Sequence, residues 1–262
     1  MNVYKPVGAL LALFVLAAGG CGVAEQVKQT ASQPPATPKE ELLTALPGPA
    51  TGAFHFALKG GEQPMQGVLD ATKKSYRIDI SQKDADLGFT MTMKFLVVDE
   101  KSWIKINFSG TNGLTGLPKL PKKWMLVDRA KLKDDDAAPL SYENETDPAE
   151  LFPVFQAAAD VKKAGTTFSG TTDLTQQGKA EIVDSKTLNA LGAAANKVPF
   201  EAVLDAQGRL TKAIIKVPAA GKAKAQRYEA VYDQYGTAES PVEPAAGEQQ
   251  KATATTYEIL NS

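Results

Sequence analysis

Cysteine and histidine are nearly absent from this chain of 262 residues, which contains one of each, Cys21 and His55. A lone cysteine forms no intramolecular disulfide, so the fold has to rest on a hydrophobic core. With one histidine and one cysteine, neither a Ser-His-Asp triad nor a zinc site has the residues it needs. We interpret His55 as a structural residue of a strand. We therefore expect no catalytic residue, no metal, no cofactor and no enzymatic activity.

An excess of charge of either sign is also lacking. The chain has 29 Lys and Arg against 30 Asp and Glu, which gives a formal net charge of −1. Domains that bind nucleic acid concentrate positive charge on one surface, so we expect no nucleic-acid partner. The acidic run at 134–136 lacks the spaced ligands and the glycine of a calcium loop, and we interpret it as a solvated loop.

The N-terminal apolar run is too short to cross a membrane. It covers residues 7–18, whereas a helix that spans a bilayer core needs about 20 apolar residues. Lys5 precedes the run, and small residues occupy positions 17–20. A charged start, a short apolar stretch and small residues at a cleavage site are typical of a secretory signal peptide. We predict this signal peptide at residues 1–20.

Cys21 directly follows those small residues, in an arrangement that resembles a bacterial lipobox. In that motif a diacylglycerol alkylates the thiol, and the chain is cut so that the cysteine becomes its first residue. The usual pattern prefers leucine three positions before the cysteine, where this chain has Ala18, with Leu16 two positions further back. We predict lipidation at Cys21, which anchors the chain to the cell membrane on its extracytoplasmic face. The alternative is an ordinary signal peptide with Cys21 as a free or intermolecularly paired thiol.

A flexible linker is predicted after the lipidated cysteine, over residues 21–38. Residues 22–38 are rich in Gln, Ala, Thr, Ser and Pro and show no apolar period, which is typical of a tether rather than a folded segment. A short helix is predicted to begin near Pro38 and to end at Pro47.

From Gly52 onward, apolar residues recur with a period of two, which indicates strands. The clearest strand is predicted at 89–97, and its apolar face comprises Phe89, Met91, Met93, Phe95 and Val97. Strands are also predicted at 54–58, 66–70, 76–80, 103–108 and 125–127. Short polar turns between consecutive strands favour an antiparallel meander.

Helices and further strands follow in the second half of the chain. Asp147, Pro148 and Glu150 form a helix-start pattern, which predicts a helix over 147–159 with Leu151, Phe152 and Phe155 on its apolar stripe. A second helix is predicted over 184–195. Strands are predicted at 166–173, 178–183, 199–205, 210–217 and 228–235, and a short one near 255–260. The fold class is therefore α+β.

In this order, the elements resemble the LppX/LprG-type lipoproteins of actinobacteria and, more distantly, the LolA-like lipid carriers. The resemblance covers most of residues 52–244 and rests on the order of several short stretches. These stretches are 95–108 before Trp124, 147–159, 167–172, 198–217 with Gly208-Arg209-Leu210, 232–236 and 241–244. It implies a strongly curved antiparallel β-sheet, a half-barrel, with helices packed across its concave face. The lipid-binding domain is then expected at 39–244, followed by a low-complexity tail at 245–262.

The resemblance also implies a function: an apolar cavity between sheet and helices that takes the acyl chains of a lipid or glycolipid in the cell envelope. Methionine suits such a cavity because its side chain is flexible and polarizable. The expected lining residues are Phe54, Phe56, Tyr76, Ile78, Phe89, Met91, Met93, Phe95, Val97, Ile104, Ile106, Leu151, Phe152 and Phe155. The expected partners are this lipid, the membrane through acylated Cys21 and an envelope protein, and we expect a monomer.

Alternation along strands predicts a solid core equally well. In that case the same residues pack under the helices, and the chain is a structural or sensory envelope lipoprotein that acts as a protein-interaction module. The empty volume beneath residues 89–97 distinguishes the two interpretations.

Overall fold

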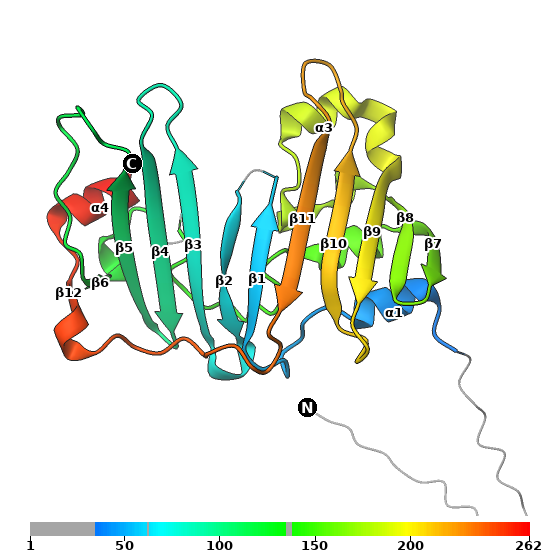
Figure 1. The fold of residues 1–262 in the computed structure, drawn as a ribbon, viewed down its shortest axis with the longest axis horizontal. Coiled ribbons are helices and arrows are strands. Elements are labelled where there is room, and N and C mark those ends of the chain that lie inside the picture. The colour runs from blue at the N-terminus through cyan, green and yellow to red at the C-terminus, as the bar shows by residue number, and fades with distance from the viewer. Residues whose placement is uncertain (1–34, 62, 135–137) are drawn as a thin grey trace, which may run out of the picture. The chain divides into compact units, whose positions relative to one another are not determined.

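The computed structural model describes residues 35–61, 63–134 and 138–262 (Figure 1). The predicted signal peptide, the lipidation site Cys21 and most of the predicted linker lie outside these residues, as does most of the acidic run at 134–136. Every helix and strand described below belongs to one compact unit, Ala36–Ser262, which has its own hydrophobic core.

One twelve-stranded sheet runs through this unit (Figure 1). Its spatial order is β12-β6-β5-β4-β3-β2-β1-β11-β10-β9-β8-β7, and all neighbours are antiparallel except the parallel pair β12 and β6. The chain returns to the middle of the sheet at β11, which joins the first meander to the second. The strands are β1 Phe54–Lys59, β2 Met65–Asp70, β3 Ser75–Lys83, β4 Thr90–Val98, β5 Lys101–Ser109, β6 Trp124–Leu126, β7 Ala159–Ala164, β8 Thr167–Thr172, β9 Val198–Leu204, β10 Leu210–Val217, β11 Gln226–Asp233 and β12 Gln249–Lys251.

The predicted α+β class and the antiparallel sheet are confirmed, but the strong curvature is wrong: the sheet is open and not strongly curved. The helices are α1 Pro38–Thr44, α2 Leu151–Gln156, α3 Ser185–Leu191 and α4 Ala254–Leu260. They lie behind the strands in Figure 1, and α1 packs against α2. Each has six or seven residues, so no helix in the described residues is long enough to lie across the whole sheet and hold it in a curved shape.

The core lies on the face of the sheet that the helices cover, because alternate side chains point to opposite faces. One row across the strands shows the pattern: Phe56 pairs with Gly67, Gly67 with Ile78, Ile78 with Phe95, and Phe95 with Ile104. Glycine is required in this row, since a Cβ at Gly67 would lie 2.0 Å from the backbone oxygen of Arg77 on β3 and 2.9 Å from Cζ of Phe56. The backbone of β3 and the ring of Phe56 leave no space for a side chain at position 67.

The helix predicted over 147–159 is shorter in the structure. Glu150 has a left-handed backbone, with φ of 50°, so regular helix begins only at Leu151. Residues after the helix belong to β7, which the sequence did not predict. On α2, Leu151 and Phe155 are buried as expected, but Phe152 is 53% exposed and does not line the core. In a helix of less than two turns, only one side can face the sheet.

Two predicted strands are absent from the described chain. Residues 178–183 contain a short 3-10 turn, Gly178–Ala180, because left-handed residues at Gly178 and Glu181 interrupt an extended backbone. The strand near 255–260 is instead α4, whose start is capped by the side chain of Thr253 accepting a hydrogen bond from the backbone N–H of Thr256.

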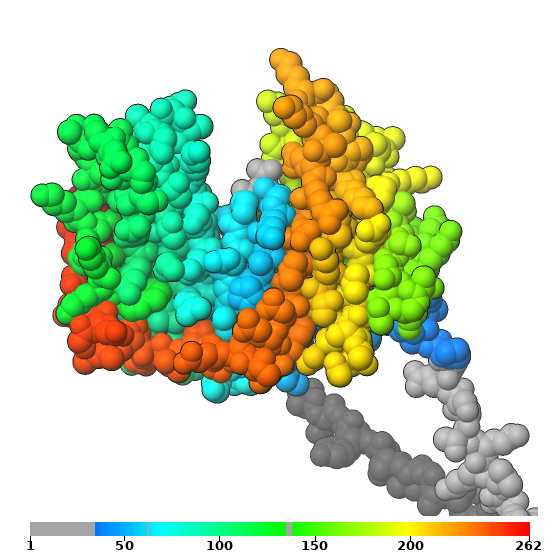
Figure 2. Space-filling model, in the orientation of Figure 1, coloured from blue at the N-terminus to red at the C-terminus, as the bar shows by residue number. Residues whose placement is uncertain are grey.

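Residues 245–262, expected as a separate tail, contribute β12 and α4 to the compact unit. The segment between β11 and β12 crosses the lower end of the sheet, as Figure 2 shows. Ser240 donates a hydrogen bond to Asp70, and Glu243 pairs with Lys101 at 2.8 Å. The indole N–H of Trp103 donates to the side-chain oxygen of Gln249 at 2.8 Å. The last of these contacts holds the end of the chain against Trp103, whose side chain lies on the face opposite the core.

Two neighbouring phenylalanines of α2 provide a matched test of where the core lies. Phe155 is fully buried, whereas Phe152 is half exposed. Phe155→Ala should lower the free energy of unfolding by about 3–5 kcal/mol, and Phe152→Ala should change it by less than about 0.5 kcal/mol. Urea unfolding of both variants gives the two values. Equal losses would show that α2 does not pack as described.

Candidate functional site

The predicted lining residues of the first meander share one face of the sheet, whereas Leu151, Phe152 and Phe155 lie on α2. Most of the predicted residues form a closely packed core. Ten are at most 9% exposed and belong to a single cluster. These ten are Phe54, Phe56, Tyr76, Ile78, Phe95, Val97, Ile104, Ile106, Leu151 and Phe155. Five surface pockets of the described chain lie elsewhere, and among the predicted residues only Ile106 borders one of them. This part of the face is filled by the protein's own side chains.

The same face becomes progressively more exposed toward the turn between β3 and β4. Along β4, Val97 and Phe95 are buried, whereas Met93 and Met91 are only partly buried. Phe89, just before the strand, is also partly buried, and Leu87 in the turn is 57% exposed. The apolar alternation therefore continues past the point where the helices cover it.

Phe108 of β5 belongs to this open end of the face, although the sequence analysis did not place it among the lining residues. It pairs with Met91 across the strands, and its ring packs edge-on against Phe89 with centroids 5.9 Å apart. Its alternation with Ile104 and Ile106 was the signal that could have identified it. We call Phe89, Met91, Met93 and Phe108 the Met–Phe patch. Ile80 and Ile106, the partners of Met93, are buried beside it.

A second candidate is a polar cluster beneath α2, centred on Asp147. Its carboxylate accepts hydrogen bonds from the backbone N–H groups of Ala149 and Leu151 and, at 2.5 Å, from the hydroxyl of Tyr232 on β11. Burial raises the pKa of the Asp147 carboxyl above its usual value, and burial likewise raises the pKa of Tyr232. A carboxyl with a raised pKa is a frequent mark of a functional site. Here its partners instead tie the start of α2 to the sheet, which is a structural role.

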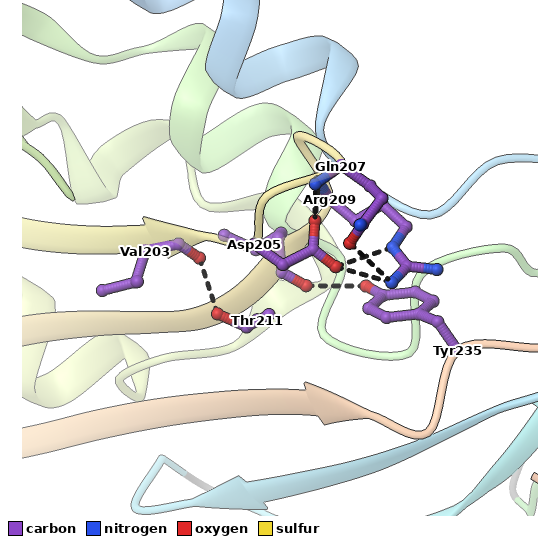
Figure 3. Close-up of polar contacts among 7 residues, drawn as sticks. Val203, Asp205, Gln207, Arg209, Thr211 and Tyr235 are labelled. Carbon is purple, nitrogen blue, oxygen red and sulfur yellow. Dashed lines mark hydrogen bonds and ion pairs between the residues drawn. The ribbon is translucent and has the colours of Figure 1, made fainter. Parts of the chain in front are cut away.

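A third cluster lies at the turn between β9 and β10 (Figure 3). Asp205 accepts hydrogen bonds from the backbone N–H groups of Gln207 and Arg209 and from Nε of Arg209. Although burial opposes it, these bonds from Arg209 hold the pKa of Asp205 below its usual value. The guanidinium of Arg209 stacks on Tyr235, whose hydroxyl donates to the carbonyl of Leu210. Asp205 neutralises Arg209, so this cluster fixes a corner of the sheet.

The corner brings together two of the stretches on which the family resemblance rests, Gly208-Arg209-Leu210 and residues 232–236. No protein-family model matches the chain, and no curated protein matches its sequence. The resemblance therefore stays a prediction.

The described residues contain no cluster of three or more His, Cys, Asp or Glu side chains placed to hold a metal ion. Nor is any helix among them long and apolar enough to span a bilayer. The Met–Phe patch is the feature of this face that has apolar side chains still open to a ligand.

The raised pKa of Asp147 predicts how stability depends on pH. Because the folded protein holds the proton more tightly than the unfolded chain, protonation of Asp147 adds stability as the pH falls through the raised pKa. This gain is complete below the unfolded value, about 4. The unfolding free energy of wild type minus that of Asp147→Asn should therefore increase from pH 7 to pH 4, measured by urea titration.

Asp205→Asn is the matched control, because the pKa of Asp205 is lowered rather than raised. The unfolding free energy of wild type minus that of Asp205→Asn should stay nearly constant from pH 7 to pH 4 and decrease only below about pH 4, where Asp205 loses the charge that Arg209 stabilises. A flat or decreasing difference for Asp147→Asn would contradict the assignment of a buried carboxyl.

Proposed function

We propose that this protein is a non-enzymatic lipoprotein, tethered through Cys21 to the extracytoplasmic face of the cell membrane. It binds an acyl chain of a lipid or glycolipid against the Met–Phe patch and carries or presents that lipid in the cell envelope. The observation that supports this proposal is the gradient of exposure along β4, from buried Val97 and Phe95 to partly buried Met93 and Met91. An apolar face that is already organised but not fully covered is a suitable surface for an aliphatic chain.

The energetic need for such a surface is large. Exposing an acyl chain to water costs about 0.8 kcal/mol for each CH₂ group, so a 16-carbon chain faces a cost on the order of 10 kcal/mol. Methionine side chains can adapt to a flexible chain, since they have three rotatable bonds and no branch. Met91 and Met93 stand next to each other on the open end of the face, flanked by two phenylalanines.

The packed core changes how a lipid would be held. Because the ten buried lining residues fill the core, the acyl chain lies along the Met–Phe patch, with Ile80 and Ile106 at the inner end of the patch. A deeper position requires the chain to displace side chains of the core. A strongly curved half-barrel with a large cavity is not part of this proposal, because the sheet is open and not strongly curved.

A second candidate function is a structural or sensory envelope lipoprotein that binds a protein partner and has a solid core. The observation that favours it is the low exposure, at most 9%, of the ten lining residues.

The lipid content of the purified protein separates the two functions. Residues 36–262, produced for export in the native host and purified without detergent, should carry about one lipid per protein by native mass spectrometry if the first function holds. A protein free of lipid would favour the interaction module.

Met93→Trp tests the site directly. The larger indole should fill the space beside Ile80 and Ile106 and lower the affinity for a palmitoyl chain by about tenfold, equivalent to about 1.4 kcal/mol. The affinity is measured by displacement of a fluorescent fatty acid. Ser169→Trp, on the exposed outer side of β8, is the matched control and should leave uptake unchanged. Unchanged uptake by a folded Met93→Trp variant would remove Met93 from the site.

A further inference from the structure

Residues 105–109 of β5 form an open edge of the sheet. Strand β6 pairs only with Trp103 and Ile104, so within the described chain no strand pairs with residues 105–109 on the side away from β4. A strand at an edge presents backbone N–H and C=O groups that another polypeptide can bind. Neither the core nor the proposed acyl site makes use of these backbone groups.

The backbone groups on the open side of this edge belong to Ile106 and Phe108. The carbonyl of Ser102 accepts a hydrogen bond from the N–H of Val127 at 2.9 Å, so the backbone groups of Ser102 face β6. Successive residues of a strand direct their N–H and C=O groups to opposite sides. Those of Ile104, Ile106 and Phe108 therefore face the same side as those of Ser102. Ile104 meets β6 there, whereas Ile106 and Phe108 meet no strand of the described chain.

A pocket of about 440 Å³ lies along this edge, between β5 and the loop that connects β5 to β6. Residues 105–108 form one wall of the pocket, and Leu117, Leu120 and Lys122 belong to the wall that the loop forms. Among the described residues, the loop has a backbone hydrogen bond from Leu114 to Thr111, and no backbone bond joins it to the edge. The loop therefore stands off from β5 and leaves space beside the unpaired backbone.

The two ends of the sheet are less suited to accept a further strand. At one end, β7 has an irregular register with β8 between Ala159 and Lys162, and Asp160 has a left-handed backbone with φ of 54°. At the other end, β12 has only three residues. Bulges and short strands are two ways in which proteins block pairing at a sheet edge. Residues 101–109 of β5, in contrast, pair with β4 without a shift in register, so their backbone is regularly extended.

The surroundings of the open edge are basic. Residues 101–127 contain five lysines and no Asp or Glu. Lys94 on β4 and Lys101 each pair with a carboxylate. Lys105 instead lies over the ring of Trp124, 4.9 Å from its centre, and Lys122 is exposed at the pocket. Neither Lys105 nor Lys122 forms an ion pair with a described residue, so both are available to a carboxylate from another chain.

The facing of the β5 side chains indicates what kind of segment fits. Lys105 and Asn107 point to one face, whereas Ile106 and Phe108 point to the other. Each side chain of an added strand lies on the same face as the β5 residue opposite to it. A segment that alternates acidic and apolar residues therefore matches both faces of this edge. A second copy of β5 fits less well, because it brings the lysines of two molecules together.

We propose that residues 105–109 of β5 bind an acidic segment of a partner protein as an additional strand of the sheet. The backbone of that segment pairs with the N–H and C=O groups of Ile106 and Phe108, and its acidic side chains face Lys105 and Lys122. The backbone bonds supply affinity, and the lysines select against basic segments. This inference does not depend on the proposed function, because these backbone groups and lysines take no part in acyl binding.

The test compares two peptides on residues 36–262. One alternates Glu and Val over about seven residues, enough for a strand of usual length, and the other has Lys in place of every Glu. Isothermal titration calorimetry should show that the Glu peptide binds at least about tenfold more tightly.

Hydrogen exchange followed by NMR shows whether the backbone pairs. At saturation with the Glu peptide, exchange of the Ile106 and Phe108 amides should slow at least about tenfold. The Lys105 and Asn107 amides, which face β4, are the internal reference and should change much less.

A charge reversal tests the role of the lysines. Lys105→Glu/Lys122→Glu should bind the Lys peptide more tightly than the Glu peptide, because the side chains that face the added strand are then acidic. Lys162→Glu/Lys222→Glu makes the same change at exposed lysines in the other half of the sheet and should keep the preference of the wild type. Circular dichroism confirms that both variants are folded.

Equal affinity of the wild type for the two peptides, or unchanged exchange of Ile106 and Phe108 at saturation, would overturn the proposal. So would failure of the Glu peptide to bind, an outcome that leaves the acyl site untouched. A dimer in sedimentation experiments without peptide, with slow exchange of the same two amides, would assign the edge to a second copy of the chain and would also overturn the acidic partner.

Discussion

The burial of one continuous apolar face is the constraint on which the rest of this structure depends. With its one cysteine outside the described residues, the compact unit has no disulfide, and its stability has to come from a core that extends from β6 to β8. The row Phe56, Gly67, Ile78, Phe95 and Ile104 shows how closely that face is packed, since the ring of one residue fills the space above the glycine of the next strand. The helices beside this face have only six or seven residues each, and the sheet stays open.

The end of the face toward the β3–β4 turn is different, and the difference suggests a function. A sheet built only for stability would end its apolar alternation where the helices end. Here the alternation continues through Met93, Met91 and Phe89, and Phe108 follows it on β5. One feature at this end works against stability, because apolar side chains remain in contact with water. In the proposed function an acyl chain covers these side chains and removes that cost.

Much of the first meander was predictable from the sequence. Apolar and polar residues alternate so regularly over 54–108 that the period of two gives both the strand positions and the face to which each side chain points. The second half was harder. A left-handed backbone at Glu150 shortens the helix expected from Asp147, and β7, with mostly exposed side chains, has no apolar period that reveals it. The end of the chain folds as α4, where the hydroxyl of Thr256 donates a hydrogen bond to the sulfur of Met125, a contact 131 residues away in sequence that no local pattern contains. For the site, alternation identified the face correctly but could not show how far the helices cover it.

The central claim is that the open end of the face, and not the filled core, receives an acyl chain. Residues 36–262 contain four methionines, Met65, Met91, Met93 and Met125, so the methyl resonances of a methionine-labelled sample can be assigned by single substitutions. Met125 is fully buried and serves as the internal reference. Titration with palmitate, followed by NMR, should shift the Met91 and Met93 resonances while that of Met125 stays in place. Resonances of Met91 and Met93 that do not move at saturating palmitate would contradict the account.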